Sequence, residues 1–295
     1  MSAVPLIVLG SASRDYTVVV ERHPLPGETL LGGDVALGPG GKGANQAAAA
    51  ARAGARPVFL GAVGKDATGD EILAELSAGG VDVSHMLSVE GVPTGVALIT
   101  VARDGENSIV VGVGANAQVL AEPTSDLLTE LAGTRTVVLA QLEIPFETVE
   151  AAAATVDRLG ARFALNVSPS QPIPATLLAV CDPVIVNESE AGDLVGRRVE
   201  STDDALEVAR ELLATAPSVV ITLGGNGVVF GDASGVSHLP SRKVTVVDTT
   251  GAGDAFAGAL AASLSEGNSL TAAVEAGIDA GALAVQHLGA QPPRG

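Results

Sequence analysis

The sequence predicts an α/β protein with a central, mostly parallel sheet flanked by helices and a small β-sheet lid. Compact apolar runs without polar alternation are typical of strands that are covered on both faces, as in a parallel sheet. Six runs have this character: 6–9, 58–61, 136–140, 163–166, 183–186 and 218–223. Helical patterns lie between several of them, and this alternation favours parallel strands joined by crossover helices.

The clearest predicted helix covers residues 203–214. Its apolar positions recur at the spacing of one helix face: Ala205, Val208, Ala209, Leu212 and Leu213. Ser201 and Asp204 offer the side chains of a capping box at its start. We therefore expect a helix that packs one apolar face against the sheet.

Two segments interrupt the alternation of strands and helices. Residues 16–20 and 30–34 flank a turn-rich stretch and predict paired strands, and residues 95–101 and 108–111 predict a hairpin with an Asp-Gly turn. Together they predict a lid, built from segments of about 15–35 and 95–112, that covers a site or pairs with another subunit. A hairpin at the edge of the main sheet is the alternative.

Length and charge restrict the class of protein. A chain of 295 residues can bury a large core, so we expect a single domain over residues 1–295. The chain has 16 basic and 34 acidic side chains, a net charge of −18. Such a field repels phosphates at long range, which argues against nucleic acid or an anionic membrane as a partner. Any phosphate must be held by local groups such as helix N-termini.

The lone cysteine, the first residues and the uncharged stretch of the chain together favour a location in the cytoplasm. Cys181 is the only cysteine, so neither an intrachain disulfide nor a cysteine-based zinc site is expected. The first five residues show no basic leader, so we expect no signal peptide. Residues 212–231 lack charged side chains, but Pro217 and a glycine cluster predict a helix end, a strand and a turn there instead of a membrane span.

The most informative segment runs from Val246 to Phe256. We expect a short apolar strand at 246–247, then the turn Gly251-Ala252-Gly253, then an apolar helix over 255–264. Free amides at a helix start form an anion site, and Asp254 stands beside them. Asp254 is either a capping residue or the base of a phosphoryl transfer to an alcohol, which needs both an anion hole and a proton acceptor. Asp248 has the chemistry to help hold a cation.

Two other segments carry polar groups at strand or helix ends. Asn187 and Glu190 follow the strand 183–186, where they form a helix cap or orient a hydrated Mg²⁺. Gly40 to Asn45 precede an alanine-rich helix and place Lys42 and Asn45 at its start; the alternative is a plain glycine turn. The GxGxxG match at 38–43 does not follow the first strand, and Lys42 is not followed by Ser or Thr, so neither a dinucleotide fingerprint nor a Walker A loop is present. The four histidines show no metal-ligand spacing.

Three motifs together resemble the ribokinase family of carbohydrate kinases: Gly-Gly-Lys-Gly-Ala-Asn-Gln at 40–46, Asn187-x-x-Glu190, and Asp-Thr-Thr-Gly-Ala-Gly-Asp at 248–254. The resemblance runs in order along nearly the whole chain and includes Gln141-Leu142-Glu143 and Gly289-Ala290-Gln291-Pro292. It implies ATP-dependent transfer to the 5-hydroxyl of D-ribose. Asp254 would be the base, and the amides of Gly251, Ala252 and Gly253 would form the anion hole.

The resemblance also implies the ligand contacts. The sugar contacts would be Ser13, Asp15, Gly41, Lys42, Asn45, Glu143 and Asp254. The nucleotide contacts would be Asn187, Thr222, Leu223, Gly224, Gly225, Asn226, Gly227 and Gly253. Glu190 would help to place Mg²⁺, and a K⁺ site would use Asp248, Thr250 and carbonyls near Ala284, His287 and Gly289. The lid would close over the sugar and join two subunits in a homodimer.

Three positions depart from the family's pattern. Ser13 stands where an asparagine usually contacts the sugar, Ile278 occupies a usually polar position near adenine, and Pro293 replaces a hydroxyl-bearing residue near the cation loop. Ser13 keeps open a kinase for another sugar or a nucleoside. A sugar sensor without catalysis is a further alternative, against which the retained Asp254 and glycine turn argue.

Overall fold

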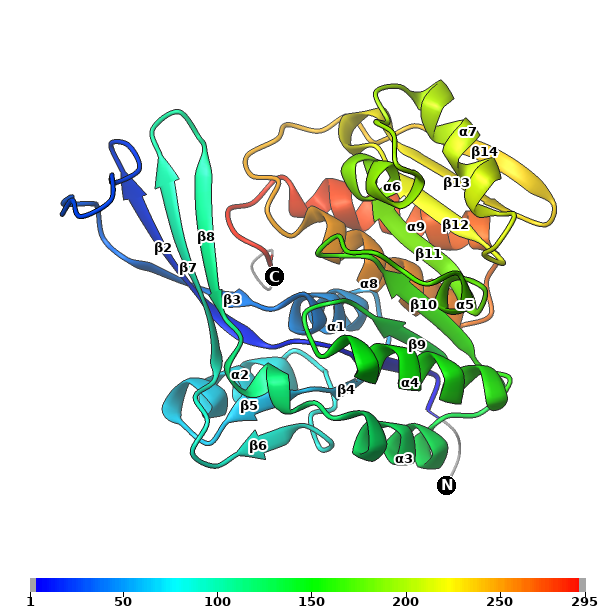
Figure 1. Cartoon of the computed structure of the whole chain (residues 1–295), viewed down its shortest axis with the longest axis horizontal. Helices are drawn as coiled ribbons and strands as arrows, with labels where there is room; N and C mark the ends of the chain where they lie inside the picture. The colour runs from blue at the N-terminus through cyan, green and yellow to red at the C-terminus, as the bar shows by residue number, and fades with distance from the viewer. Residues whose placement is uncertain (1–3, 292–295) are drawn as a thin grey trace.

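The computed structural model describes residues 4–291, and its centre is an eight-stranded sheet in the order β14-β13-β12-β11-β10-β9-β1-β4 (Figure 1). Its strands are β1 (Leu6–Leu9), β4 (Val58–Leu60), β9 (Val137–Ala140), β10 (Arg162–Asn166), β11 (Cys181–Asn187), β12 (Val219–Thr222), β13 (Val228–Asp232) and β14 (Gly235–Leu239). Neighbours are parallel from β4 to β12, and β13 and β14 join antiparallel at one edge. The six apolar runs all form strands of this sheet, as predicted.

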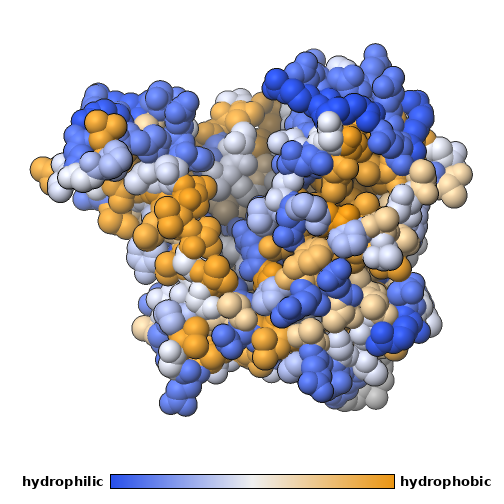
Figure 2. Space-filling model, viewed as in Figure 1, coloured by the Kyte–Doolittle hydropathy of each residue, from blue (hydrophilic) through white to orange (hydrophobic). Residues whose placement is uncertain are grey.

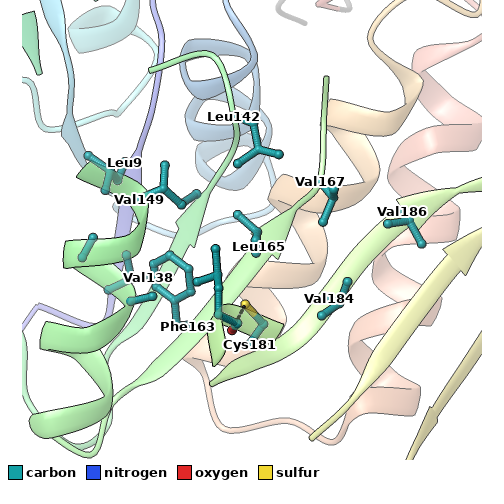
Figure 3. Packing of buried hydrophobic residues seen from close by; sticks show 14 of the residues in the cluster. Leu9, Val138, Leu142, Val149, Phe163, Leu165, Val167, Cys181, Val184 and Val186 are labelled. Atoms are coloured by element: carbon teal, nitrogen blue, oxygen red, sulfur yellow. Dashed lines mark hydrogen bonds between the residues drawn. The ribbon is translucent and has the colours of Figure 1, made fainter. Parts of the chain in front are cut away.

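Helices cover both faces of the sheet. One face carries α1 (Lys42–Arg52), α2 (Ala67–Ala78), α8 (Ala252–Ser265) and α9 (Leu270–Ala284). The other carries α3 (Ala121–Leu131), α4 (Phe146–Arg158), α5 (Ala175–Leu178), α6 (Glu188–Val195) and α7 (Thr202–Leu212). In the second layer Phe163 of β10 lies near Val149 of α4, and Val184 lies near Cys181 on β11 (Figure 3). Each such fully buried side chain stabilises the fold by about 1.5–3 kcal/mol.

The close approach of α1 and α8 depends on small side chains. A Cβ atom at Gly258 of α8 would lie 2.4 Å from the carbonyl oxygen of Gln46 in α1. Buried alanines continue α1 after Gln46, so no bulky side chain separates the two helices. This contact brings the first turn of α1 beside the first turn of α8.

The lid is a separate four-stranded sheet in the order β3-β2-β7-β8. Its strands are β2 (Ser13–Val20), β3 (Ala36–Gly40), β7 (Gly95–Ala102) and β8 (Asn107–Gly112). The predicted hairpin is confirmed as β7–β8, and the alternative of an edge hairpin on the main sheet is wrong. A further two-stranded sheet joins β5 (Ala62–Gly64) to β6 (Leu87–Val89).

The predicted strand at 30–34 is wrong, because β2 pairs with residues 36–40 instead. The Gly-Pro-Gly of this strand reads as a turn in sequence. It is accommodated because β3 lies at the sheet edge, where the N–H that Pro39 lacks has no partner to lose.

Two further local expectations need correction. Residues 246–247 form no strand; Val246 and Val247 are exposed, and the N–H of Val247 donates to the carbonyl of Val285 at 2.7 Å. The helix predicted at 203–214 is α7, with Ser201 accepting from the N–H of Asp204. The Asp204 carboxylate also accepts from the N–H of Glu200 at 3.0 Å, and α7 ends at Leu212 instead of 214.

Within residues 4–291, no helix has the length and apolar character needed to cross a membrane. The uncharged stretch 212–231 contains the end of α7, then β12, a 3₁₀ turn and most of β13, as predicted. Pro293 lies outside the described residues.

Candidate active site

The candidate site lies where the carboxyl ends of the parallel strands meet the lid. Glu143, Asn187 and Thr222 all lie at or just after the ends of strands β9, β11 and β12, the edge at which open α/β sheets bind ligands. A pocket of about 700 Å³ separates this edge from the lid. Figure 2 shows the hollow between the lid and the body, with apolar side chains along its lid side.

The predicted sugar contacts all line this one pocket. They are Ser13, Asp15, Gly41, Lys42, Asn45, Glu143 and Asp254. Four apolar lid side chains complete the wall: Ala97, Ile99, Ile109 and Val111. A polar floor under an apolar cover suits a small polyhydroxylated ligand whose hydroxyls need fixed partners.

Glu143 is held by two donors from neighbouring elements. The Ser11 hydroxyl donates to its Oε2 at 2.5 Å, and the N–H of Lys42 donates to the same oxygen at 2.9 Å. The second bond also satisfies one of the unpaired N–H groups at the start of α1. The other oxygen, Oε1, has no such bond within the described residues and remains for a ligand.

Glycines let the backbone approach the pocket closely. Gly41 has φ of 85°, and a Cβ there would lie 2.7 Å from the Cα of Ala12. A Cβ at Gly40 would lie 1.9 Å from an Asp15 carboxylate oxygen. Residues 40–41 are therefore packed closely against Ala12 and Asp15, which a plain exposed turn does not require.

Asp254 lies in the first turn of α8 and is 9% exposed. Its Oδ2 accepts from the Asn45 side chain at 3.2 Å and its Oδ1 from Gln46 at 2.9 Å. Burial raises the pKa of the Asp254 carboxyl, although the charge of Lys42 and these two hydrogen bonds act in the opposite direction. A raised pKa makes the carboxylate a stronger proton acceptor.

The turn before α8 offers two open amides where the sequence predicts three. Within the described residues, the N–H groups of Gly251 and Gly253 have no hydrogen-bond partner, whereas that of Ala252 donates to Thr249 at 3.2 Å. Ala252 is therefore a correction to the predicted anion hole: its N–H closes the turn. Gly251 is left-handed (φ 74°), and a Cβ there would lie 2.3 Å from the carbonyl oxygen of Ala290.

A second pocket of about 460 Å³ lies on the other side of this turn. It is lined by five of the predicted nucleotide contacts, Thr222, Gly224, Gly225, Gly227 and Gly253, together with Ile278 and Phe256. Leu223 and Asn226 do not line it: Leu223 is buried in the core, and the Asn226 carbonyl accepts from His238 at 2.7 Å. Glycines leave room at this rim, since nothing lies within 4 Å of a Cβ at Gly225 or Gly253.

Asn187 and Glu190 form a complete capping box at the start of α6. The Asn187 Oδ1 accepts from the N–H of Glu190 at 2.9 Å, and Glu190 Oε2 accepts from the N–H of Asn187 at 2.8 Å. Asn187 also lines a third, open pocket of about 940 Å³, which shares Thr222 and Gly253 with the nucleotide side. Among residues 4–291, no group of three or more His, Cys, Asp or Glu side chains is arranged to hold a metal ion.

Asp248 ties the turn to the segment after α9. Its Oδ1 accepts from the N–H and hydroxyl of Thr250, and its Oδ2 accepts from the N–H of Gly289 at 2.8 Å. Burial opposes ionisation, but the hydrogen bonds from Thr250 and Gly289 outweigh it and lower the pKa of Asp248. Ala284 ends α9, and its carbonyl accepts from the N–H of His287. The predicted cation residues therefore lie on two adjoining segments.

The model of the pfkB family of carbohydrate kinases matches residues 5–294. This chain belongs to that family. The ribokinase of Haemophilus influenzae is 36% identical over 287 residues, which cover 97% of this chain and 94% of that protein. The ribokinase of Bacillus subtilis is 37% identical over 286 residues, with 97% and 94% covered. The solved structure of Arabidopsis thaliana ribokinase with ribose and ATP has a TM-score of 0.89 at 33% identity and covers 98% of this chain and 94% of its own.

This pfkB-family kinase also carries site residues that the sequence analysis gave no role. Gln46 donates to Asp254, and Asn166 and Gln141 bond in turn to Gln46. The lid residues Ile99 and Ile109 alternate with outward residues along their strands, a period-2 pattern visible in the sequence. The position of Gln46 directly after the glycine-lysine-asparagine segment was the available signal for its place in the site.

Proposed function

We propose that this kinase transfers the γ-phosphoryl group of ATP to the 5-hydroxyl of D-ribose, giving ribose 5-phosphate and ADP. The observation that carries the proposal is the position of Asp254. It faces a polar pocket on one side and adjoins a turn with two open amides, Gly251 and Gly253, that leads to the nucleotide side on the other. The relatives named ribokinase, at 36–37% identity over nearly the full length, support the choice of substrate.

In this reaction, the polar floor orients the sugar and Asp254 accepts the proton of its hydroxyl. The bond between the sugar oxygen and the γ-phosphorus forms while the bond from that phosphorus to the bridging oxygen breaks, and ADP leaves with the electron pair. The N–H groups of Gly251 and Gly253 stabilise charge on the moving group. Glu143 Oε1 and Asn45 lie in the same pocket and hold the sugar hydroxyls that do not react.

Two cations complete the proposed chemistry. Mg²⁺ prefers few carboxylates with several waters and phosphate oxygens. We assign a hydrated ion to Glu190, which is buried behind the open pocket that its capping partner Asn187 lines. The ion would neutralise phosphate charge. K⁺ would be held by Asp248, Thr250 and carbonyls near Ala284, His287 and Gly289. Support for this site comes from the bond of Asp248 Oδ2 to Gly289, which joins the two segments.

The outer lid face is the proposed interface of a homodimer. Register places Leu37, Tyr16, Leu98 and Val110 side by side across β3, β2, β7 and β8, on the face opposite the pocket. Leu37, Leu98 and Val110 are each more than half exposed, and a second copy would bury this row. We place the enzyme in the cytoplasm, where a buried free thiol such as Cys181 stays reduced.

A coupled assay that follows ADP release with ribose, ATP and Mg²⁺, with and without K⁺, tests the proposed function. We expect turnover with ribose, and a product phosphorylated at the 5-position by NMR. A panel of other pentoses, hexoses and nucleosides tests the alternative raised by Ser13. Turnover with one of these and none with ribose would overturn the choice of substrate.

A further inference from the structure

The two oxygens of Asp254 have different surroundings. Oδ2 accepts from Asn45, which lines the sugar pocket, whereas Oδ1 accepts from Gln46 at 2.9 Å. Gln46 is 0% exposed and is not part of the pocket wall. Gln46 therefore contacts the carboxylate on the side away from the sugar pocket, where no substrate reaches it.

The Gln46 amide has no free hydrogen-bonding group on this side. Its Nε2 donates to both Asp254 Oδ1 and Asn166 Oδ1, each at 2.9 Å, and its Oε1 accepts from Gln141 at 2.6 Å. The Asn166 amide donates in turn to the carbonyl of Ile185. Because an ionised carboxylate only accepts hydrogen bonds, this arrangement holds only when Nε2 faces Asp254. The amide of Gln141 therefore fixes the direction of the Gln46 amide.

Gln141 serves this role at a cost to stability. Within the described residues, its Oε1 is the single buried side-chain oxygen or nitrogen without a hydrogen-bond partner. It occupies space that only a glycine at position 10 provides, because a Cβ there would lie 1.9 Å from Oε1. Buried polar groups are normally satisfied, and exceptions concentrate at functional sites. A leucine or methionine at 141 would fill the same space without an orphaned acceptor.

We propose that Gln46 is a positioning residue for Asp254 and that Gln141 fixes the Gln46 amide so that it donates to Oδ1. The pair holds the carboxylate plane with Oδ2 toward the sugar pocket and favours its ionised form. This inference rests on the proposed function of Asp254 as the base. Hydrogen bonding to the charged form of a carboxyl lowers its pKa and opposes the effect of burial.

Gln46→Met, which keeps the length of the side chain and removes its polar groups, tests the proposal. We expect kcat to fall about tenfold or more, since positioning of a catalytic group contributes on this scale. The acidic limb of the kcat–pH profile should move upward by about one pH unit, because the ionised form loses a hydrogen bond. The KM for ATP should stay within about twofold.

Gln46→Glu keeps shape and volume but places a second carboxylate beside Asp254. Like charges raise the pKa of the pair, so the acidic limb should move further upward than in Gln46→Met. Thr136→Val is the matched control: Thr136 is a buried side chain directly before β9 whose hydroxyl donates to the Val4 carbonyl at 2.7 Å, at the opposite end of the strand from the pocket. It should lower the melting temperature and leave the acidic limb in place.

If Gln46→Met does not fold, Gln141→Met provides the same comparison with Gln46 retained, and we expect a smaller shift in the same direction. A folded Gln46→Met or Gln141→Met enzyme whose kcat and acidic limb match those of the unsubstituted enzyme overturns the inference alone. Failure of the unsubstituted enzyme to phosphorylate any sugar overturns the proposed function, and this inference with it.

Discussion

Asp15 and Asp254 are carboxylates of the same pocket that have different surroundings and different proposed roles. Asp254 has two amide donors and adjoins the open turn of α8. Burial, and then the nearby charge of Glu143, raise the pKa of Asp15 to about 6. Above this pH Asp15 is ionised and can accept a hydrogen bond from a sugar hydroxyl. When the pocket is empty, the buried charge destabilises the fold.

Asp15→Asn should weaken sugar binding and stabilise the fold at high pH. The folded state binds a proton on Asp15 more tightly than the unfolded chain, so ionised Asp15 destabilises the fold above pH 6, and this effect vanishes below its ordinary pKa near 4. We expect a higher melting temperature than wild type at pH 8, no gain at pH 4, and a KM for ribose raised about tenfold. Thermal scans at both pH values and steady-state kinetics measure these.

Asp232→Asn is the control for this comparison. Hydrogen bonds from Ser234 lower the pKa of Asp232, so its ionised form stabilises the fold and the variant should melt lower than wild type at pH 8. If Asp15→Asn also melts lower at pH 8, the assigned environment of Asp15 is wrong.

Among the elements, the turn before α8 leaves no room for a side chain at Gly251. Gly251→Ala would place a Cβ 2.3 Å from the Ala290 carbonyl and would also require a left-handed alanine. The conformation alone costs about 1–2 kcal/mol, and the clash must displace the turn that carries the open amides. We expect a large loss of kcat together with a lower melting temperature.

Gly267→Ala is the control that separates the cost of a left-handed alanine from the cost of the steric clash in Gly251→Ala. Gly267 also has positive φ (85°), but nothing lies within 4 Å of a Cβ there. It should lose only the conformational term, about 1–2 kcal/mol, and retain activity. Equal kcat in the two variants would show that the Gly251 turn does not act in catalysis. Urea unfolding and the coupled assay measure both effects.

The elements differ in how well sequence predicts them, for physical reasons. The six buried strands are apolar on both faces and carry their own signal. The edge strand Ala36–Gly40 carries no such signal, because its Gly-Pro-Gly is typical of a turn. It is tolerated only at a sheet edge, and the position of a strand in its sheet depends on the tertiary structure. Val246 and Val247 carry a strand signal but have no strand beside them to pair with, and the N–H of Val247 bonds to Val285 instead.

At the scale of the whole molecule, the site combines parts that are distant along the chain. The motifs at 40–46 and 248–254 predict which residues meet, since Asn45 and Asp254 hydrogen-bond across 209 positions. The roles of Gln46, Gln141 and Asn166 could not be predicted, because each depends on the contact of α1 with α8 and on the position of β10. The closed turn at Ala252 is likewise visible only once Thr249 is placed beside it.

The lid is expected to join two copies of the chain. Leu98→Glu places a charge within the exposed apolar row of the outer lid face, where it would be desolvated by a partner. We expect a dimer for the unsubstituted enzyme and a monomer for the variant by analytical ultracentrifugation at micromolar concentration. Leu120→Glu, at an exposed leucine before α3, is the control and should remain dimeric. A wild-type monomer, or a dimeric Leu98→Glu, would contradict this interface.

The most direct test of proton removal by Asp254 is to measure both kcat and the affinity for ATP in the variant Asp254→Asn. The amide keeps the shape of the side chain but cannot accept the hydroxyl proton, so we expect kcat to fall by about 10²–10⁴-fold. The dissociation constant for ATP, measured by calorimetry without sugar, should stay within about twofold, because the amides of Gly251 and Gly253 are unchanged. A variant that binds ATP and turns over ribose at the wild-type rate would contradict the role of Asp254 as the base.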